Sequence, residues 1–145
     1  MKKTVCELFA GVGGFRCGLN NINENVQYSK ENIENEKWKT VWFSQWEPAE
    51  KTTQYAHDCY VYHFGTCLDK NGKDTTNINI EDVDKSTLPD FSLLVGGFPC
   101  QDYSVASSLA TSKGLEGKKG VYGGRLEKYW KKNNHHLCCW KMLID

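Results

Sequence analysis

Short apolar runs alternate with polar stretches along the chain, and the first half contains two such runs. Thr4–Phe9 is mostly apolar and predicts a strand, and the glycine-rich stretch Ala10–Gly14 follows it directly. Phe15–Leu19 predicts a helix that continues from this loop. Thr40–Trp46 is rich in β-branched and aromatic residues, which favours a second strand, and Ala49–Tyr60 predicts a second helix. This succession is typical of the start of an α/β sheet.

The second half of the chain continues the alternation. Asp69–Asp74 is polar and contains a glycine, so it predicts a turn, and Asn77–Ile80 predicts a short strand. Phe91–Val95 is almost entirely apolar, as expected of a parallel strand buried on both faces, and Gly96–Gly97 should end it. Four strands separated by helical or polar connections favour one parallel sheet. The expected fold class is therefore α/β.

The composition is that of a globular domain. The 145 residues include 18 basic and 18 acidic side chains, so the formal net charge is zero, which argues against a strongly basic protein that coats nucleic acid. No apolar run is long enough to span a bilayer, and Glu7 interrupts the region where a secretory signal needs apolar residues. We therefore expect a cytoplasmic protein. The seven cysteines include no C-x-x-C pair, which favours free thiols over a structural zinc site.

Three groups that could carry chemistry follow predicted strands: the Gly11–Gly14 loop, Glu47 and Cys100. Because ligands of parallel sheets lie beyond the carboxyl ends of the strands, we expect these groups at one edge. The glycines would let the backbone approach a ligand, although a plain tight turn is the alternative. Glu47 could accept hydrogen bonds from ribose hydroxyls, and its alternative is an acid in the first turn of a helix. Together the two features suggest a nucleoside cofactor.

Cys100 follows a predicted buried strand. A thiol at a strand end near a helix N-terminus can have a lowered pKa and act as a nucleophilic thiolate, whereas the alternative is a small buried hydrophobic residue. The sequence places no histidine as its base, because His57 and His63 are expected at the surface. Adjacent pairs of potential ligands rarely converge on one ion, so no metal is expected at His135–His136 and Cys138–Cys139.

These groups fall within recognisable motifs. ELFAGVGGFRCGL at Glu7–Leu19 and GGFPCQDYSVA at Gly96–Ala106 resemble the first and fourth signature motifs of the DNA cytosine C5-methyltransferases. Gln45–Pro48 resembles the second motif, and the order and separation of all three fit. The resemblance covers about Thr4–Val121. The Asp-Tyr-Ser after Gln101 is more similar to the bacterial DNA enzymes than to the related transfer-RNA branch.

The resemblance implies a Rossmann-like methyltransferase fold with S-adenosyl-L-methionine as cofactor. The residues that it places at the cofactor are Phe9, Ala10, Gly11, Gly13, Gly14, Trp46, Glu47, Ile80 and Pro99. Among these, Glu47 would hold the ribose. The third motif of the family usually has an acid before an isoleucine near the adenine. Asn79 stands before Ile80 here, so the chain departs from the family at that contact.

The resemblance also implies the reaction, which is transfer of a methyl group to C5 of cytosine in DNA. Cys100 would attack C6 of a cytosine flipped out of the duplex, which makes C5 able to accept the methyl group. Loss of the C5 proton and expulsion of the thiolate would then release 5-methylcytosine. Gln101 and Ser104 would shape the site for the flipped base. Double-stranded DNA is the expected partner, and a restriction–modification setting with a cognate restriction endonuclease follows by analogy.

The chain departs from the family after about Val121. A Glu-Asn-Val motif, a later arginine motif, a target-recognition region and a C-terminal cofactor motif are not found. The residues from Val121 onward can be back-translated into a permitted set of codons and read in a shifted frame. The shifted sequence begins Leu-Trp-Trp-Glu-Ile and ends Val-Leu-Leu-Glu-Asn-Val-Asp-Arg, which resembles the family. We therefore expect a partial cofactor-binding and catalytic domain over residues 1–121. Residues 122–145 are expected to be an out-of-frame tail without function.

Two alternatives stay open. The first is an inactive truncated remnant that at most binds S-adenosylmethionine. The second is a nucleotide-binding oxidoreductase of Rossmann type, although the glycine spacing G-x-G-G differs from the dinucleotide pattern G-x-G-x-x-G.

Overall fold

The computed structural model describes residues 3–22, 33–47, 53–99 and 137–143. Its elements, in chain order, are β1 (Thr4–Leu8), α1 (Gly14–Leu19), β2 (Lys39–Ser44), α3 (Tyr55–Phe64), a 3-10 turn (Lys85–Thr87), β3 (Leu93–Pro99) and β4 (Leu137–Leu143). The strands form one sheet in the order β2-β1-β3-β4, and every neighbouring pair is parallel. This confirms the predicted α/β class and is the arrangement expected of a Rossmann-like fold.

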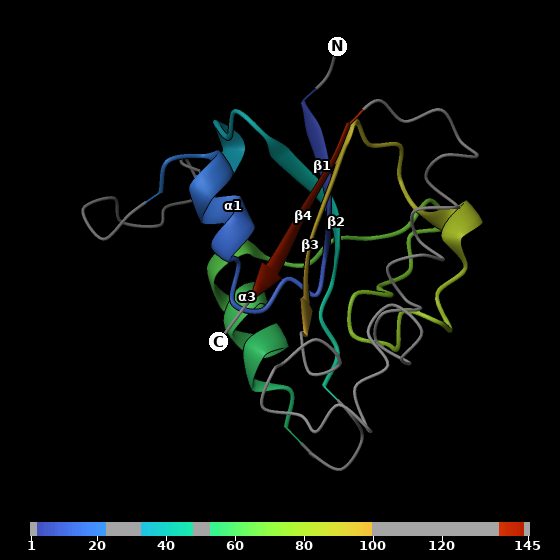
Figure 1. Ribbon diagram of the computed structural model, residues 1–145. Coiled ribbons are helices and arrows are strands. Elements are labelled where there is room, and N and C mark those ends of the chain that lie inside the picture. The colour runs from blue at the N-terminus through green and yellow to red at the C-terminus, as the bar shows by residue number, and fades with distance from the viewer. Residues whose placement is uncertain (1–2, 23–32, 48–52, 100–136, 144–145) are drawn as a thin grey trace, which may run out of the picture.

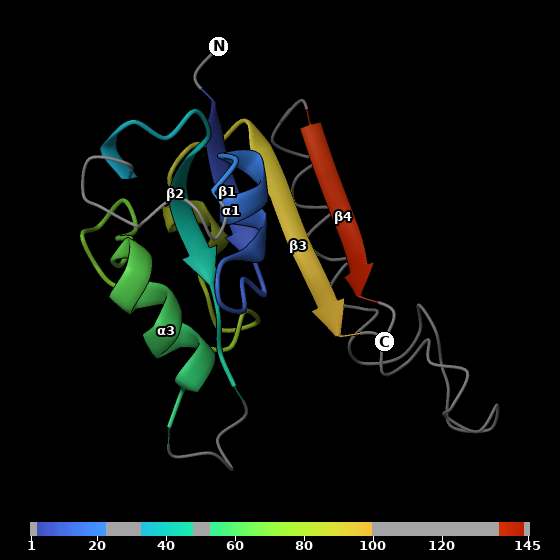
Figure 2. The ribbon, with the colours of Figure 1, turned by 90° about the vertical axis from the view of Figure 1, so that its left-hand side faces the viewer.

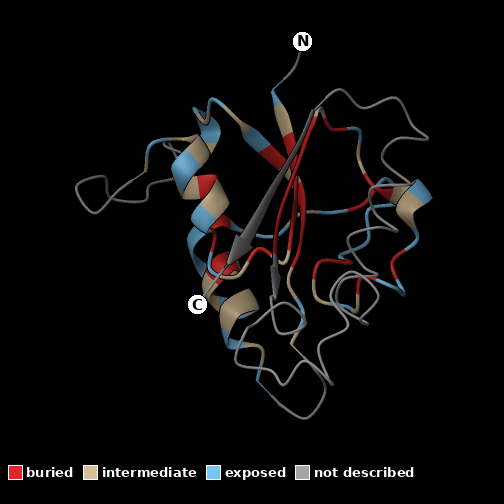
Figure 3. Cartoon of the chain, viewed as in Figure 1, coloured by how far each residue is buried: buried red, intermediate tan, exposed pale blue. Residues whose placement is uncertain are grey.

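The sheet is covered on both faces. Helices α1 and α3 lie on one face, and the segment between α3 and β3, which includes the 3-10 turn, lies on the other (Figures 1 and 2). All residues from Val5 to Leu8 are buried, as are Trp42 and Phe43 of β2, so the middle of the sheet is the centre of the core (Figure 3). A strand that is covered on both faces has no face for polar side chains, which explains why the sequences of β1 and β2 are mostly apolar along their length.

The two faces have different packing partners. Cys6, Leu8 and Trp42 pack in one cluster with Ile80 and Leu88 from the segment that precedes β3. The indole N–H of Trp42 also donates a hydrogen bond to Thr75 Oγ1 at 3.2 Å, which satisfies this buried donor.

On the other face, Phe43 packs with Ala10, Tyr60 and Phe64. The Phe43 and Tyr60 rings stack with their centroids 4.0 Å apart. Burial of these large aromatic rings fixes α3 against the end of β2.

Several element boundaries differ from the sequence predictions. β2 ends at Ser44 rather than Trp46. β3 runs through Gly96 and Gly97, which were expected to end it, because both glycines pair with residues of β4. Helix α3 begins at Tyr55 and not at Ala49, and residues 49–52 of the predicted helix lie outside the described residues. It ends before Gly65, whose φ of 77° favours glycine as a helix terminator.

The predicted strand at Asn77–Ile80 is wrong. Asn79 instead closes a turn: its carbonyl accepts a hydrogen bond from the Asp82 N–H at 2.8 Å, and its side-chain oxygen accepts one from the Glu81 N–H at 3.2 Å. Such local bonds from asparagine compete with sheet pairing. The fourth strand of the sheet is β4, in a region to which the sequence analysis assigned no element.

The predicted turn at Asp69–Asp74 is confirmed. The N–H of Gly72 donates to the Asp69 carbonyl at 3.0 Å, and the Asp69 side chain accepts from the N–H groups of Asn71 and Lys73. Neither of the helices among the described residues is long and apolar enough to cross a membrane. The described residues also contain no group of three or more side chains arranged to hold a metal ion.

Candidate functional site

The candidate site lies beyond the carboxyl ends of β1 and β2. β2 pairs with β1 on one side and β3 pairs with β1 on the other, so the strand order reverses at β1. In open parallel sheets a ligand is expected beyond the carboxyl ends of the strands at such a point. The loop after β1 and the segment after β2 both emerge there. The sequence predicted this edge from the order of strands and loops alone.

The glycine loop has an unusual backbone. Three residues within five have positive φ: Phe9 at 52°, Gly11 at 57° and Gly13 at 96°. Only glycine adopts this region without steric cost, and a left-handed conformation at Phe9 costs on the order of 1–2 kcal/mol. Such strain persists only where surrounding contacts determine it, and it is often found where a ligand binds.

Packing explains why position 13 is glycine. A Cβ at Gly13 would lie 2.4 Å from Phe64 Cε2, which is far inside van der Waals contact. At Gly11, by contrast, a Cβ would meet no atom within 4 Å, and the neighbouring Val12 is 59 % exposed. The loop is therefore pressed against α3 at one end and open at its tip. An open tip of bare backbone fits the approach of a nucleoside cofactor.

Two consecutive N–H groups tie the glycine loop to the end of β2. Ala10 donates to the Ser44 carbonyl at 3.0 Å, and Gly11 donates to the side-chain oxygen Oε1 of Gln45 at 2.8 Å. A third bond, from the Gly13 N–H to the Ala10 carbonyl at 3.0 Å, closes the turn within the loop. The loop and the segment after β2 are therefore bonded directly to each other, at the edge of the sheet where the sequence predicted both; that they share a ligand stays a prediction.

Glu47 lies three residues beyond the end of β2 and faces α3. Its Oε1 accepts a hydrogen bond from the Ala56 N–H at 3.1 Å, in the first turn of that helix. The Gln54 side chain bonds both backbone groups of Glu47, accepting from its N–H at 2.7 Å and donating to its carbonyl at 2.9 Å. One carboxylate oxygen thus bonds the first turn of α3, although Glu47 precedes this helix and does not lie in its first turn; the ribose contact stays a prediction. Trp46 beside it is 37 % exposed.

A buried polar network lies beneath the glycine loop. Glu7 of β1 has no solvent exposure, and its Oε2 accepts a hydrogen bond from the Tyr60 hydroxyl at 2.9 Å. Burial raises the pKa of Glu7 to about 7, although the Tyr60 hydrogen bond and the positive charge of Arg16 act in the opposite direction. Burial therefore favours the neutral form of the Glu7 carboxyl more than it would for an exposed glutamate.

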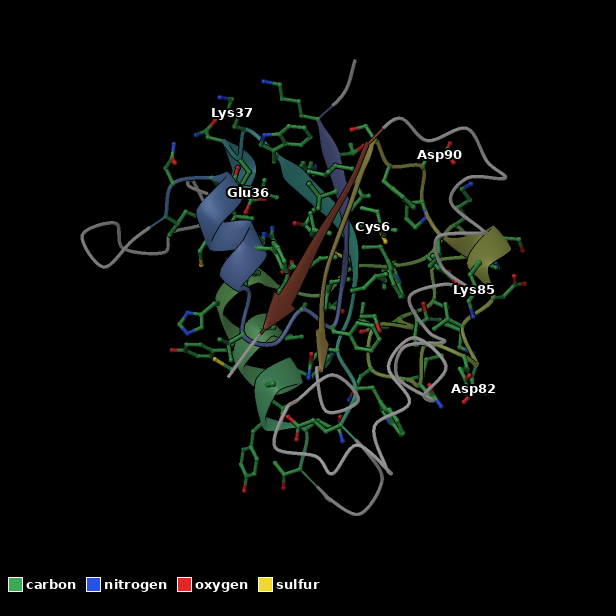
Figure 4. The ribbon with its side chains drawn as sticks, viewed as in Figure 1. Cys6, Glu36, Lys37, Asp82, Lys85 and Asp90 are labelled. Carbon is green, nitrogen blue, oxygen red and sulfur yellow. The ribbon has the colours of Figure 1, made fainter. Side chains whose placement is uncertain are left out.

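Arg16 of α1 forms the second part of this network. Its Nε and one terminal nitrogen donate to the two carboxylate oxygens of Glu36 at 2.6 and 2.9 Å, and both side chains are almost fully buried. Its guanidinium also lies 4.7 Å from the centre of the Phe64 ring. Figure 4 shows Glu36 beside α1. The pair attaches the residues before β2 to the helix that follows the glycine loop.

Sequence reasoning missed this network because its members are distant in the chain. Glu7 and Tyr60 are 53 positions apart, and Arg16 and Glu36 are 20 apart. One signal was available: Glu7 is an acid inside the apolar run Thr4–Phe9, and a buried strand rarely carries an unpaired charge.

The structure corrects one of the two histidine predictions. His57 was expected at the surface, but its side chain is only 12 % exposed, and its Nε2 lies 2.9 Å from Thr76 Oγ1. It is held there because α3 packs His57 against Phe43, with ring centroids 5.7 Å apart. His63 is exposed, as expected.

The remaining predicted site residues fall into two groups. Ile80 is 5 % exposed and packs in the core with Leu8 and Trp42, and Pro99 is the last residue of β3. Three predicted residues lie outside the described residues, so their roles stay predictions: Cys100, Gln101 and Ser104.

Two other cysteines are poor nucleophiles. Burial raises the pKa of the Cys67 thiol to about 11, and burial also raises the pKa of Cys6, far above its usual range. Both side chains therefore stay protonated at neutral pH, as expected of cysteines that pack as small hydrophobic residues.

Comparison with known proteins agrees with this geometry. The chain is 42 % identical over 128 residues to the Type II methyltransferase M.Sau3AI of Staphylococcus aureus, which is 88 % of this chain and 27 % of that protein. It is 32 % identical over 115 residues to the Type II methyltransferase M.HhaI of Haemophilus parahaemolyticus, covering 79 % of the chain and 26 % of the relative. The orphan methyltransferase M.Rho11sI of Bacillus phage rho11s is 34 % identical over 121 residues, which is 83 % of this chain and 19 % of that protein.

The chain thus spans between about a fifth and about a quarter of the length of these curated relatives. A family model described as C-5 cytosine-specific DNA methylase matches residues 3–123, which include the whole of the glycine loop, β2, α3 and β3. The chain belongs to the C-5 cytosine-specific DNA methylase family.

Proposed function

We propose that this chain carries the cofactor-binding and nucleophile-bearing part of an enzyme that methylates C5 of cytosine in DNA, with S-adenosyl-L-methionine as methyl donor. The observation that carries the proposal is the junction of the glycine loop with the end of β2, at the point where the strand order reverses. The family match over residues 3–123 supports the reaction class. The oxidoreductase alternative is set aside, because that family consists of methylases.

The proposed cofactor site uses backbone more than side chains. The open tip of the loop at Gly11 and the exposed Val12 leave room for a ligand to approach the main chain. Trp46 and Glu47 follow on the adjacent strand end, where they would contact the nucleoside. When bound, the cofactor supplies an electrophilic methyl group on a sulfonium. The hydrogen bonds that preform the loop reduce the ordering that binding would otherwise require.

The proposed chemistry rests on Cys100, one residue beyond β3. Its thiolate would add to C6 of the cytosine, which makes C5 nucleophilic enough to take the methyl group. Removal of the C5 proton would then restore the double bond as the thiolate leaves, so the thiolate is regenerated. The base must be flipped out of the duplex for this attack.

A covalent trap tests this proposal. Purified chain is incubated with S-adenosyl-L-methionine and a duplex containing 5-fluorocytosine, and the protein–DNA adduct is followed on a denaturing gel. In this base fluorine replaces the C5 proton, so the final elimination is blocked and the covalent adduct persists. We expect an adduct with the wild type and with Cys59→Ser, a control on α3, but none with Cys100→Ser. An adduct that persists in Cys100→Ser would contradict the assignment of the nucleophile.

A second candidate is the inactive alternative from the sequence analysis, in which the chain binds S-adenosylmethionine without methylating DNA. Calorimetric binding of the cofactor together with no adduct in the trap would identify this state. An adduct would exclude it.

We further propose that residues 122–145 result from a reading-frame shift. The family model ends at residue 123, close to the proposed boundary, which supports this view. β4 lies beside β3, where the recoded sequence would place its glutamate motif. Sequencing the gene around the codon for Val121 tests the idea, and a tail that is intact in its own frame in independent isolates would refute it.

The names of the relatives support a restriction–modification setting for the proposed activity. Two are named Type II methyltransferases, whereas the phage relative is named an orphan methyltransferase. A gene for a restriction endonuclease next to the gene for this chain would support the first setting. Protection of host DNA from that endonuclease would test it.

A further inference from the structure

A side chain from outside the glycine loop accepts a hydrogen bond from its backbone. Ala10 is anchored to β2 through backbone atoms, but the N–H of Gly11 donates to the side-chain oxygen of Gln45 at 2.8 Å. Gly11 lies midway between Phe9 and Gly13, the other two residues with positive φ. The identity of residue 45 therefore decides whether the centre of this strained turn has a fixed partner.

Gln45 is itself held from the opposite side. Its backbone N–H donates to the Thr76 carbonyl at 2.9 Å. Thr76 has no solvent exposure, and both its N–H and its hydroxyl donate to Asp74 Oδ1, at 2.9 and 2.7 Å. His57 of α3 bonds the same hydroxyl at 2.9 Å. The side chain that reaches Gly11 thus extends from a backbone that is bonded to buried Thr76, whose own partners are the partly buried His57 and the exposed Asp74.

We propose that Gln45 is a positioning residue for cofactor binding, because its side-chain oxygen holds the glycine loop in the conformation that the cofactor meets. The inference rests on the proposed function for its ligand. Gln45 acts through the backbone of Gly11. The role requires a hydrogen-bond acceptor at the end of a side chain of this length. Glutamate also provides such an acceptor, whereas methionine has a similar shape but is only a weak acceptor.

Amide hydrogen exchange in the full chain tests the contact without any ligand. We expect the Gly11 amide to exchange about tenfold faster in Gln45→Met than in the wild type, and no faster in Gln45→Glu. Gln54→Met is the matched control, because it removes a glutamine whose bonds go to Glu47 instead. Unchanged Gly11 exchange in Gln45→Met, or equal acceleration in Gln54→Met, would overturn the proposal.

Binding of S-adenosyl-L-homocysteine, the cofactor without its methyl group, tests the consequence. We expect Gln45→Met to weaken binding by about three- to tenfold, and Gln45→Glu to restore it to near the wild-type value. Equal affinity of Gln45→Met and wild type would overturn the positioning role. If the wild type itself does not bind S-adenosyl-L-homocysteine, the proposed function is wrong about the cofactor. The exchange rate of the Gly11 amide still decides whether Gln45 holds the loop.

Discussion

Replacing Glu7 with glutamine should remove a specific pH dependence of folding stability. The pKa of this buried acid is raised from 4.5 to about 7, chiefly by burial. A raised pKa means that the folded state holds the proton more tightly than the unfolded state. The contribution of Glu7 to stability is therefore complete below about pH 4.5, falls as the pH rises, and is lost above about pH 7.

The size of this effect follows from the shift. Each pKa unit corresponds to about 1.36 kcal/mol, so the difference between 4.5 and about 7 corresponds to about 3 kcal/mol. Glutamine is a neutral analogue of the protonated acid and keeps an oxygen that can accept the Tyr60 hydrogen bond. We therefore expect Glu7→Gln to match the wild type near pH 4.5 and to exceed its free energy of unfolding by up to about 3 kcal/mol at pH 8.

Urea denaturation followed by tryptophan fluorescence, at intervals from pH 4.5 to pH 8, measures this difference directly. Glu34→Gln is the matched control, because it makes the same substitution at an exposed carboxylate. Groups common to all three proteins cancel when the profiles are subtracted. A difference between Glu7→Gln and wild type that stays constant with pH, or that shrinks toward pH 8, would refute the reasoning.

The other predictions concern packing around the same loop. Gly13→Ala should lower the free energy of unfolding by about 1–3 kcal/mol, because φ is 96° and the new Cβ would lie 2.4 Å from a Phe64 carbon. Gly14→Ala is its matched control and should be nearly neutral in the same urea titration, since a Cβ there meets no atom within 4 Å. Glu36→Gln should cost about 3 kcal/mol by leaving the buried guanidinium of Arg16 without its charged partner. Equal stability of Glu36→Gln and wild type across thermal and urea unfolding would show that this ion pair contributes little.

The elements that the sequence predicted well are those specified by neighbouring residues. β1, the glycine loop and α1 follow from an apolar run, three glycines and a short helical segment, all within about sixteen residues. β2 and β3 were recognised because a strand buried on both faces must be apolar along its length. The location of the candidate site followed as well, because parallel strands place all their carboxyl ends at one edge.

The errors arose where local hydrogen bonds opposed a plausible pattern. Ile78 and Ile80 alternate with asparagines as in a strand, but Asn79 bonds the following backbone and closes a turn. His57 is a polar residue of a type that is usually found at the surface, and only the packing of α3 on Phe43 showed that its side chain is largely buried. The secondary-structure propensities of single residues do not predict these interactions, because the interactions depend on which segments of the chain pack together.

The sequence by itself determined the family, the parallel sheet and the edge of the sheet at which the candidate site lies, because these depend on the order and spacing of short motifs. Only the tertiary structure decided how the site is held. It showed that the Glu7 carboxyl accepts a hydrogen bond from Tyr60, that Glu47 accepts one from the first turn of α3, and that Gln45 accepts one from Gly11. Each of these contacts joins residues from different elements, so its existence depends on a fold that brings distant positions within hydrogen-bond distance.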